Sequence, residues 1–136
     1  MERRDFIKDQ IEDFGRVLGK LLMKLVGAKG PGDVEQSTHV VEQALSSELD
    51  LDLAELLEKD NDDFIQTLVH DLDISDDNLG RLAELIWEIG KNKLADISKK
   101  HFEKSLAIYQ YLSNHSQTYS LVWINKIKKL QSLIDS

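Results

Sequence analysis

Two glycines near residue 30 have the spacing of a phosphate-binding loop. Gly27 and Gly32 match its G-x-x-x-x-G portion, but the lysine and hydroxyl residue that normally follow are replaced by Asp33 and Val34. A carboxylate at that position would repel a phosphate group rather than bind it. We therefore interpret this segment as a loop between two helices.

A second cluster begins like a calcium-binding loop. Asp71, Asp73 and Ser75 occupy alternate positions, but the sixth position is Asp76 instead of glycine and the twelfth is Leu82 instead of glutamate. The residues are typical of a helix N-cap, so the sequence predicts no metal site. The histidines lie far apart along the chain, at His39, His70, His101 and His115.

The residue types of hydrolytic enzymes are present, but their arrangement does not indicate catalysis. No strand-to-helix turn that could expose a nucleophilic serine is indicated. Adjacent acids such as Asp62 and Asp63 point apart on a helix, so they share a proton poorly. We expect no catalytic residue, no cofactor and no enzymatic activity.

The composition indicates one ordinary domain, residues 1–136. The 136 residues include 25 acidic and 17 basic side chains, one proline and no cysteine, giving a net charge of −8. The lack of cysteine excludes a disulfide scaffold and cysteine-based metal or redox chemistry. The negative net charge disfavours nucleic-acid binding. No signal-peptide pattern and no apolar run of about 18 residues occur, so we expect a cytoplasmic protein.

The charge is distributed unevenly. Residues 33–77 contain fifteen acidic side chains and one basic one, whereas residues 1–30 and 78–136 carry a small basic excess. Three interpretations stay open: short helices with acidic first turns, basic ends packed on the acidic middle, or an acidic surface that binds a basic partner.

The sequence predicts a long first helix within residues 1–30. Its apolar residues recur in alternating steps of four and three, which places them on one face: Ile7, Ile11, Phe14, Leu18, Leu21 and Leu25. The acidic middle, 33–77, is expected to form short helices capped by Asp33, by Asp52, and by Asp60 or Asn61. The alternating run 49–53 resembles a strand, but it is short and has no partner strand, so we reject a strand there.

Residues 78–136 are predicted to form a helical hairpin and a closing helix. Ser75 caps a helix that reaches Gly90 or continues to Ile97, and further helices span about 99–113 and 119–134. The expected fold is all-α, with six to seven helices in a stack of hairpins.

The first helix has a second stripe that favours an interaction surface. Gly15, Gly19, Leu22 and Val26 lie beside the main apolar face, and each helical glycine costs about 1 kcal/mol, so another helix is expected to approach closely. We hypothesise a homodimer through this helix, the alternative being a helix at the centre of the monomer. Tyr111 lies off the buried stripe of its helix and is a further candidate contact residue.

Parts of the chain resemble an uncharacterised bacterial family of all-helical proteins with a tetratricopeptide-like C-terminal region. The resemblance lies in residues 3–7 and 10–12, in 83–86 with Gly90, in 102–109 and in 118–120. The spacing of Phe102, Ser105, Leu106 and Tyr109 is similar to the second helix of a tetratricopeptide repeat, with serine in place of the usual alanine. The resemblance implies one degenerate hairpin and no assigned activity.

These observations favour a non-catalytic protein-interaction module or adaptor. The alternative is an accessory protein of a membrane surface or cell envelope that acts through the amphipathic first helix. Acidic residues in the first thirteen positions disfavour that alternative, because anionic lipids would repel them.

Overall fold

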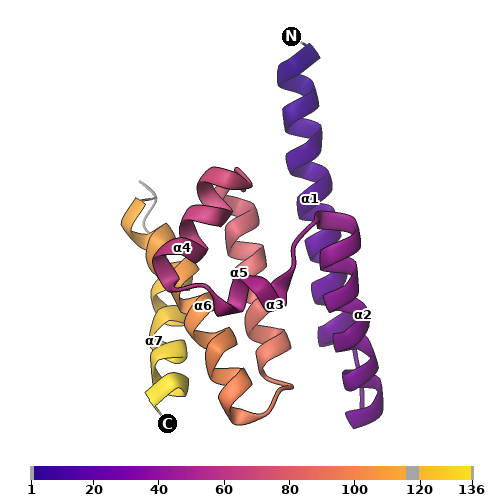
Figure 1. The fold of residues 1–136 in the computed structure, drawn as a ribbon, viewed down its shortest axis with the longest axis vertical. Coiled ribbons are helices and arrows are strands. Elements are labelled where there is room, and N and C mark those ends of the chain that lie inside the picture. Colours follow the sequence, from indigo (N-terminus) through magenta and orange to yellow (C-terminus); the bar gives the residue numbers. More distant parts are fainter. Residues whose placement is uncertain (1, 116–119, 136) are drawn as a thin grey trace.

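The computed structural model describes residues 2–115 and 120–135, of which the side chains are described from residue 10 onward. Within these residues the chain forms seven α-helices and no strand, which confirms the all-α prediction (Figure 1). One π-helical turn, η1, follows the fourth helix. The elements are α1 (Glu2–Val26), α2 (Pro31–Leu49), α3 (Leu53–Glu58), α4 (Asn61–Gln66), η1 (Thr67–Asp71), α5 (Asp76–Gly90), α6 (Ala95–His115) and α7 (Leu121–Asp135).

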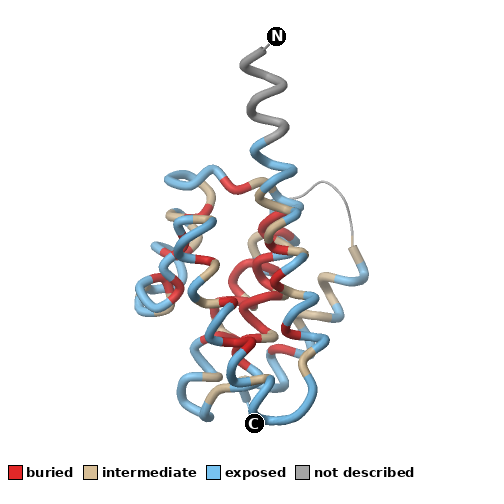
Figure 2. Tube along the Cα trace, turned by 90° about the vertical axis from the view of Figure 1, so that its right-hand side faces the viewer, coloured by how far each residue is buried: buried red, intermediate tan, exposed pale blue. Residues whose placement is uncertain are grey.

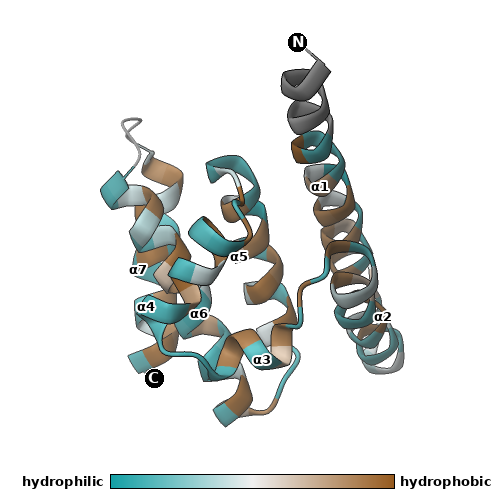
Figure 3. Ribbon diagram, turned by 45° about the horizontal axis from the view of Figure 1, so that its top comes forward, coloured by the Kyte–Doolittle hydropathy of each residue, from teal (hydrophilic) through white to brown (hydrophobic). Residues whose placement is uncertain are grey.

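Helix α5 is the centre of the fold. It packs against α1 and α6, while α2 packs on α1 and α7 packs on α6. Hydrophobic residues alternate with polar ones along α5 beyond its first turn (Figure 3), and the buried residues concentrate in the middle of the molecule (Figure 2). The fully buried side chains of α5 are Leu79, Leu82, Ala83, Leu85, Ile86 and Ile89. Packing on two sides explains why nine of the fifteen residues of this helix are buried.

The predicted apolar face of α1 enters the core only along its second half. Leu18, Leu21 and Leu25 are buried, Phe14 is half-buried, and Ile11 is 40% exposed. Ile7 lies outside the described side chains. The N-terminal turns of α1 extend beyond the other helices (Figure 1). The apolar face of α1 therefore becomes more exposed to solvent from Leu18 toward residue 10.

Side-chain caps begin the helices of the acidic middle as predicted. The carboxylate of Asp52 accepts a hydrogen bond from Glu55 N at 3.3 Å, and that of Asp60 accepts one from Asp63 N at 2.8 Å. Ser75 Oγ caps α5 by accepting from Asn78 N at 3.3 Å. These caps explain why residues 49–53 turn between two helices instead of forming a strand.

The predicted boundaries were wrong at two places. α2 begins at Pro31, because Gly30 takes up the cap position with a φ of 82° and proline suits the first helical turn. Asp33 instead accepts a hydrogen bond from the backbone N of Lys29 at 2.9 Å.

The second boundary error concerns the start of α6, which lies at Ala95 rather than near residue 99. α5 ends at Gly90, the shorter of the two predicted alternatives. Ser98 Oγ donates to Gly90 O at 2.7 Å across the turn between α5 and α6. The bond provides a partner for one of the carbonyl groups at the C-terminal end of α5. Tyr119, the predicted start of the last helix, lies outside the described residues, and α7 runs from Leu121.

Some basic side chains of the C-terminal third contact the acidic middle within the molecule. Lys93 Nζ lies 3.1 Å from Glu42 Oε1, and Lys100 Nζ lies 2.8 Å from Glu58 Oε1. Lys104 Nζ donates to Asn61 Oδ1 at 2.9 Å. The Lys100–Glu58 pair is largely exposed, and exposed pairs contribute only about 0–1 kcal/mol. The acidic middle therefore retains most of its charge at the surface.

Candidate functional site

The close helix approach predicted for the glycine stripe occurs within the chain at Gly15. A Cβ atom on Gly15 would lie 2.8 Å from Asn78 Oδ1 and 3.1 Å from an Arg81 guanidinium nitrogen. Asn78 is buried, and its Nδ2 donates to Ile11 O at 3.0 Å. Gly15 thus allows Asn78 of α5 to reach the backbone of α1.

The other predicted contact residues do not share that environment. A Cβ on Gly19 would meet no atom within 4 Å, Leu22 is half-buried, and Val26 is 65% exposed. The two sides of α1 are covered by α5 and α2 of the same chain, so the width of its apolar face is explained without a second copy. Homodimerisation stays a prediction. Tyr111 lies on a different surface, where its ring stacks on His115 at a centroid distance of 4.2 Å.

Replacing each of the two glycines of α1 by alanine should change the stability of the protein in opposite directions. We expect Gly19→Ala to raise the free energy of unfolding by roughly 0.5–1 kcal/mol, because helix propensity improves and space is available. Gly15→Ala should lower it by about 1 kcal/mol, because it displaces the Asn78 side chain from its bond to α1. Urea unfolding measures both changes. Stabilisation by Gly15→Ala would contradict the assigned contact.

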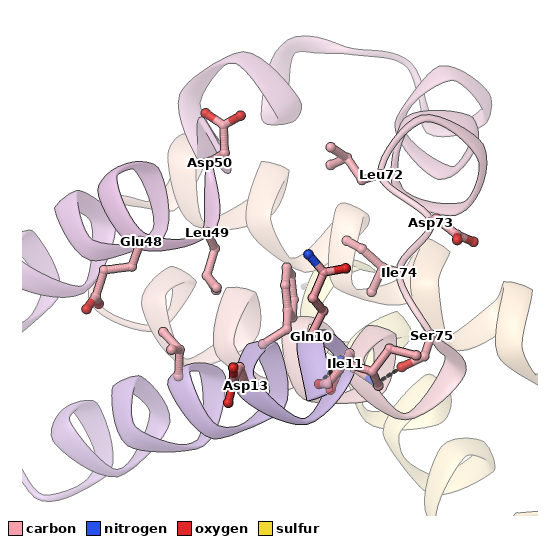
Figure 4. A pocket seen from close by; sticks show the side chains of 13 residues that line it. Gln10, Ile11, Asp13, Glu48, Leu49, Asp50, Leu72, Asp73, Ile74 and Ser75 are labelled. Carbon is pink, nitrogen blue, oxygen red and sulfur yellow. Dashed lines mark hydrogen bonds between the residues drawn. The ribbon is translucent and has the colours of Figure 1, made fainter. Parts of the chain in front are cut away.

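The most distinctive surface feature is a groove between α1, the end of α2 and the start of α5 (Figure 4). It has a volume of about 530 Å³. We call it the acidic groove. Its apolar residues are Ile11, Phe14, Val17, Leu49, Leu72 and Ile74, and the charged residues among its described lining are acidic: Asp13, Glu48, Asp50 and Asp73. An apolar floor with charges of one sign around it suits a partner of the opposite charge.

Two aspartates border the groove at the same unusual backbone conformation. Asp50 has a φ of 56° and Asp73 a φ of 51°, which are the positive φ values among the described non-glycine residues. The left-handed region costs energy for most side chains, and aspartate tolerates it better than most. Each such residue ends a helical segment, after which the chain turns back: Leu51 N donates to Leu45 O at 2.9 Å and Ile74 N to Leu68 O at 3.0 Å.

The two turns have similar sequences. Leu49-Asp50-Leu51-Asp52 and Leu72-Asp73-Ile74-Ser75 each place an aspartate in the left-handed conformation, bury the next apolar residue and then cap a new helix. From the sequence alone these runs were interpreted separately, the first as a rejected strand and the second as a rejected calcium loop. Their repetition is the signal that could have identified the groove.

The π-helical turn η1 directly precedes Leu72 and the second of these two turns. Leu72 N donates to Thr67 O at 2.9 Å, five residues back. Leu72, which is 39% exposed, follows directly and lines the groove. π-Helical turns are rare and often lie at functional sites.

The groove offers chemistry for binding a cationic and apolar partner. Carboxylates without a bound proton accept hydrogen bonds only, and among the side chains described from residue 10 onward no basic residue or histidine lines the groove. The one hydroxyl that lines it, Ser75, is engaged as the cap of α5. Among the side chains that the structure describes, no cluster of three histidine or acidic residues is placed to hold a metal ion.

A second groove lies between α2 and the α5–α6 turn. Glu35, His39 and Glu42 line it from α2, with Lys93 opposite. His39 and Glu42 have the H-x-x-E spacing of some metal ligands, which sequence analysis did not single out. Glu42 is paired with Lys93, which withdraws it from a metal-binding role.

Two buried polar atoms in the described part of the chain lack a hydrogen-bond partner: His101 Nε2 and Trp87 Nε1. His101 Nδ1 donates to Ile97 O at 2.8 Å, so Nε2 is the unprotonated nitrogen of the neutral ring. Burial lowers the pKa of His101, with a smaller contribution from Lys93.

No family model, curated protein or solved structure matches this chain. The bacterial family and the tetratricopeptide-like region suggested by sequence stay predictions. Across the described residues, no helix combines the length and apolar character needed to cross a bilayer.

Proposed function

We propose that this protein is a non-catalytic interaction module whose acidic groove binds a segment of another protein. The expected segment has apolar side chains that fill the space between α1 and Leu72, with lysine or arginine residues beside them. The observation that carries the proposal is an exposed apolar floor around which the described side chains include four acidic and no basic ones.

The apolar residues supply the binding energy in this proposal. Ile11 is 40% exposed and Leu72 is 39% exposed, and they lie on opposite sides of the groove (Figure 4). Covering such side chains contributes about 25 cal/mol for each Å² removed from water. The surrounding carboxylates contribute less energy but select the sign of the partner's charge and accelerate its approach.

A role at a lipid surface through α1 has less support. The residues that would enter the lipid, Leu18, Leu21 and Leu25, are buried in the core of the protein. Exposing them would require α1 to leave α5 and α2.

The proposal is tested with Asp50→Asn/Asp73→Asn, which removes two charges from the groove. Asparagine also tolerates the left-handed conformation, so the turns should persist. The probe is a labelled amphipathic peptide of lysine and leucine, compared with a glutamate and leucine peptide of the same length. We expect binding of the lysine peptide to weaken about 2- to 30-fold, the equivalent of two exposed charge pairs.

Glu55→Gln/Asp62→Asn is the matched control. It removes two exposed charges from α3 and α4, outside the groove, and should leave peptide affinity unchanged. Fluorescence anisotropy gives the affinities, and amide chemical shifts locate the bound peptide. The proposal fails if the glutamate peptide binds equally well, or if both double variants weaken binding alike.

A further inference from the structure

Trp87 of α5 lies beneath three lysine ammonium groups. Lys126 Nζ is 5.0 Å from the centre of its ring, Lys91 Nζ is 5.4 Å away, and Lys129 Nζ is 5.6 Å away. Lys91 directly follows the last residue of α5, and the other two lysines belong to α7. We call these four residues the Trp87–lysine cluster. Its charge contrasts with that of the acidic groove.

The positive charge of the cluster is only partly compensated. Lys91 pairs with Glu88 at 2.9 Å, and Lys126 lies 3.7 Å from Glu84, beyond the range of a strong hydrogen bond. Lys129 forms no ion pair within the part of the chain that the structure describes. Attraction to the ring offsets part of the repulsion among the ammonium groups, but one charge stays in excess.

The cluster also contains a buried donor without an acceptor. Trp87 is 3% exposed, and its Nε1 has no hydrogen-bond partner. An indole N–H and an ammonium group can donate hydrogen bonds but cannot accept them. Because the Nε1 atom is buried, a ligand would contact the ammonium groups of the cluster, and it must therefore be negatively charged and rich in acceptors.

We infer that the Trp87–lysine cluster binds a compact oxyanion of the phosphate class and thereby links α5 to α7. A phosphate group has several acceptor oxygens and more than one negative charge, so it can contact ammonium groups from both helices at once. The group could be free in solution or part of a lipid headgroup, since both present the same oxygens. This site is separate from the acidic groove and does not depend on the proposed function.

The test uses the full chain carrying Trp123→Phe, because Trp87 is then the single tryptophan. Inorganic phosphate is titrated while Trp87 fluorescence and its indole N–H chemical shift are recorded. Sodium chloride at matched ionic strength is the reference. Lys126→Gln/Lys129→Gln removes two ligands of the site, and Lys99→Gln/Lys128→Gln removes two exposed charges of α6 and α7 as the matched control.

We expect a saturable response to phosphate that chloride does not produce. It should weaken about tenfold or more in Lys126→Gln/Lys129→Gln and persist in Lys99→Gln/Lys128→Gln. Equal responses to phosphate and chloride, or equal loss in both double variants, would show that the lysine stems merely cover the ring. If the cluster variant fails to fold, the chloride comparison on the parent chain alone decides.

A second arm distinguishes the two sources of phosphate. Flotation is measured with vesicles of phosphatidylcholine, with and without phosphatidic acid. Cluster-dependent flotation with phosphatidic acid assigns the site to a headgroup. Phosphate binding without flotation assigns it to a soluble phosphate.

Discussion

Gly90→Ala is expected to lower the free energy of unfolding by about 1–3 kcal/mol, the usual cost of overpacking a core. A Cβ atom on Gly90 would lie 2.6 Å from His101 Cβ and 3.2 Å from Phe102 Cε1. His101 Cβ is fixed to the backbone of α6, so a side-chain rotation cannot relieve the contact. Relief requires α6 to move away from α5, which would loosen the centre of the core.

Gly80→Ala on the same helix is the matched control. A Cβ there would lie 3.9 Å from Leu112 Cδ1, an ordinary contact, so the gain in helix propensity should stabilise the protein by about 0.5–1 kcal/mol. Thermal unfolding should separate the two variants clearly, at about 4 °C for each kcal/mol. If both variants gain stability alike, α5 and α6 do not meet at Gly90.

The helices could be predicted from sequence because their signals are local. The caps Asp52, Asp60 and Ser75 each lie three residues before the N–H group that they satisfy, and a short window of sequence contains both. The apolar face of α1 is likewise a property of one segment. This is why the fold class was predictable from the sequence.

The sequence left the end of α5 open between Gly90 and Ile97, because the packing at Gly90 is not local. His101, eleven residues later, packs directly on Gly90. The packing of Gly15 under Asn78 is a similar case. A glycine inside a helix indicates that another part of the chain packs closely on it. The sequence does not identify the distant residue that makes this contact.

The acidic groove was missed for the same physical reason. It combines residues near positions 10–17, 48–50 and 72–78, which no periodic pattern links. The acidic excess of residues 33–77 was visible, yet only the two left-handed aspartates place part of that charge beside the apolar residues of α1. Acidic residues form a binding surface of this kind only where turns of the backbone place their side chains beside exposed apolar residues.

His101 should make the protein less stable as the pH falls below its ordinary pKa of 6.5. Burial lowers the pKa of the folded-state ring, while the exposed ring of the unfolded chain titrates normally. Above pH 6.5 both states are neutral at this residue. Below it, the unfolded chain binds the proton first, so the free energy of unfolding falls by up to about 1.4 kcal/mol per pH unit until the folded-state pKa is reached.

His101→Gln isolates this contribution from that of the many carboxylates, which both proteins share. Glutamine does not titrate, so the difference in unfolding free energy between variant and parent should shift in favour of the variant as the pH falls from 7 to 5. His70→Gln, at an exposed histidine, should show no such trend. Urea unfolding at several pH values gives the differences, and a pH-independent difference for His101→Gln would contradict a neutral buried ring. Lys93 lowers the pKa of His101 and Glu42 raises it. These two residues are paired with each other at 3.1 Å, so their effects oppose one another. Burial is therefore the dominant cause of the lowered pKa.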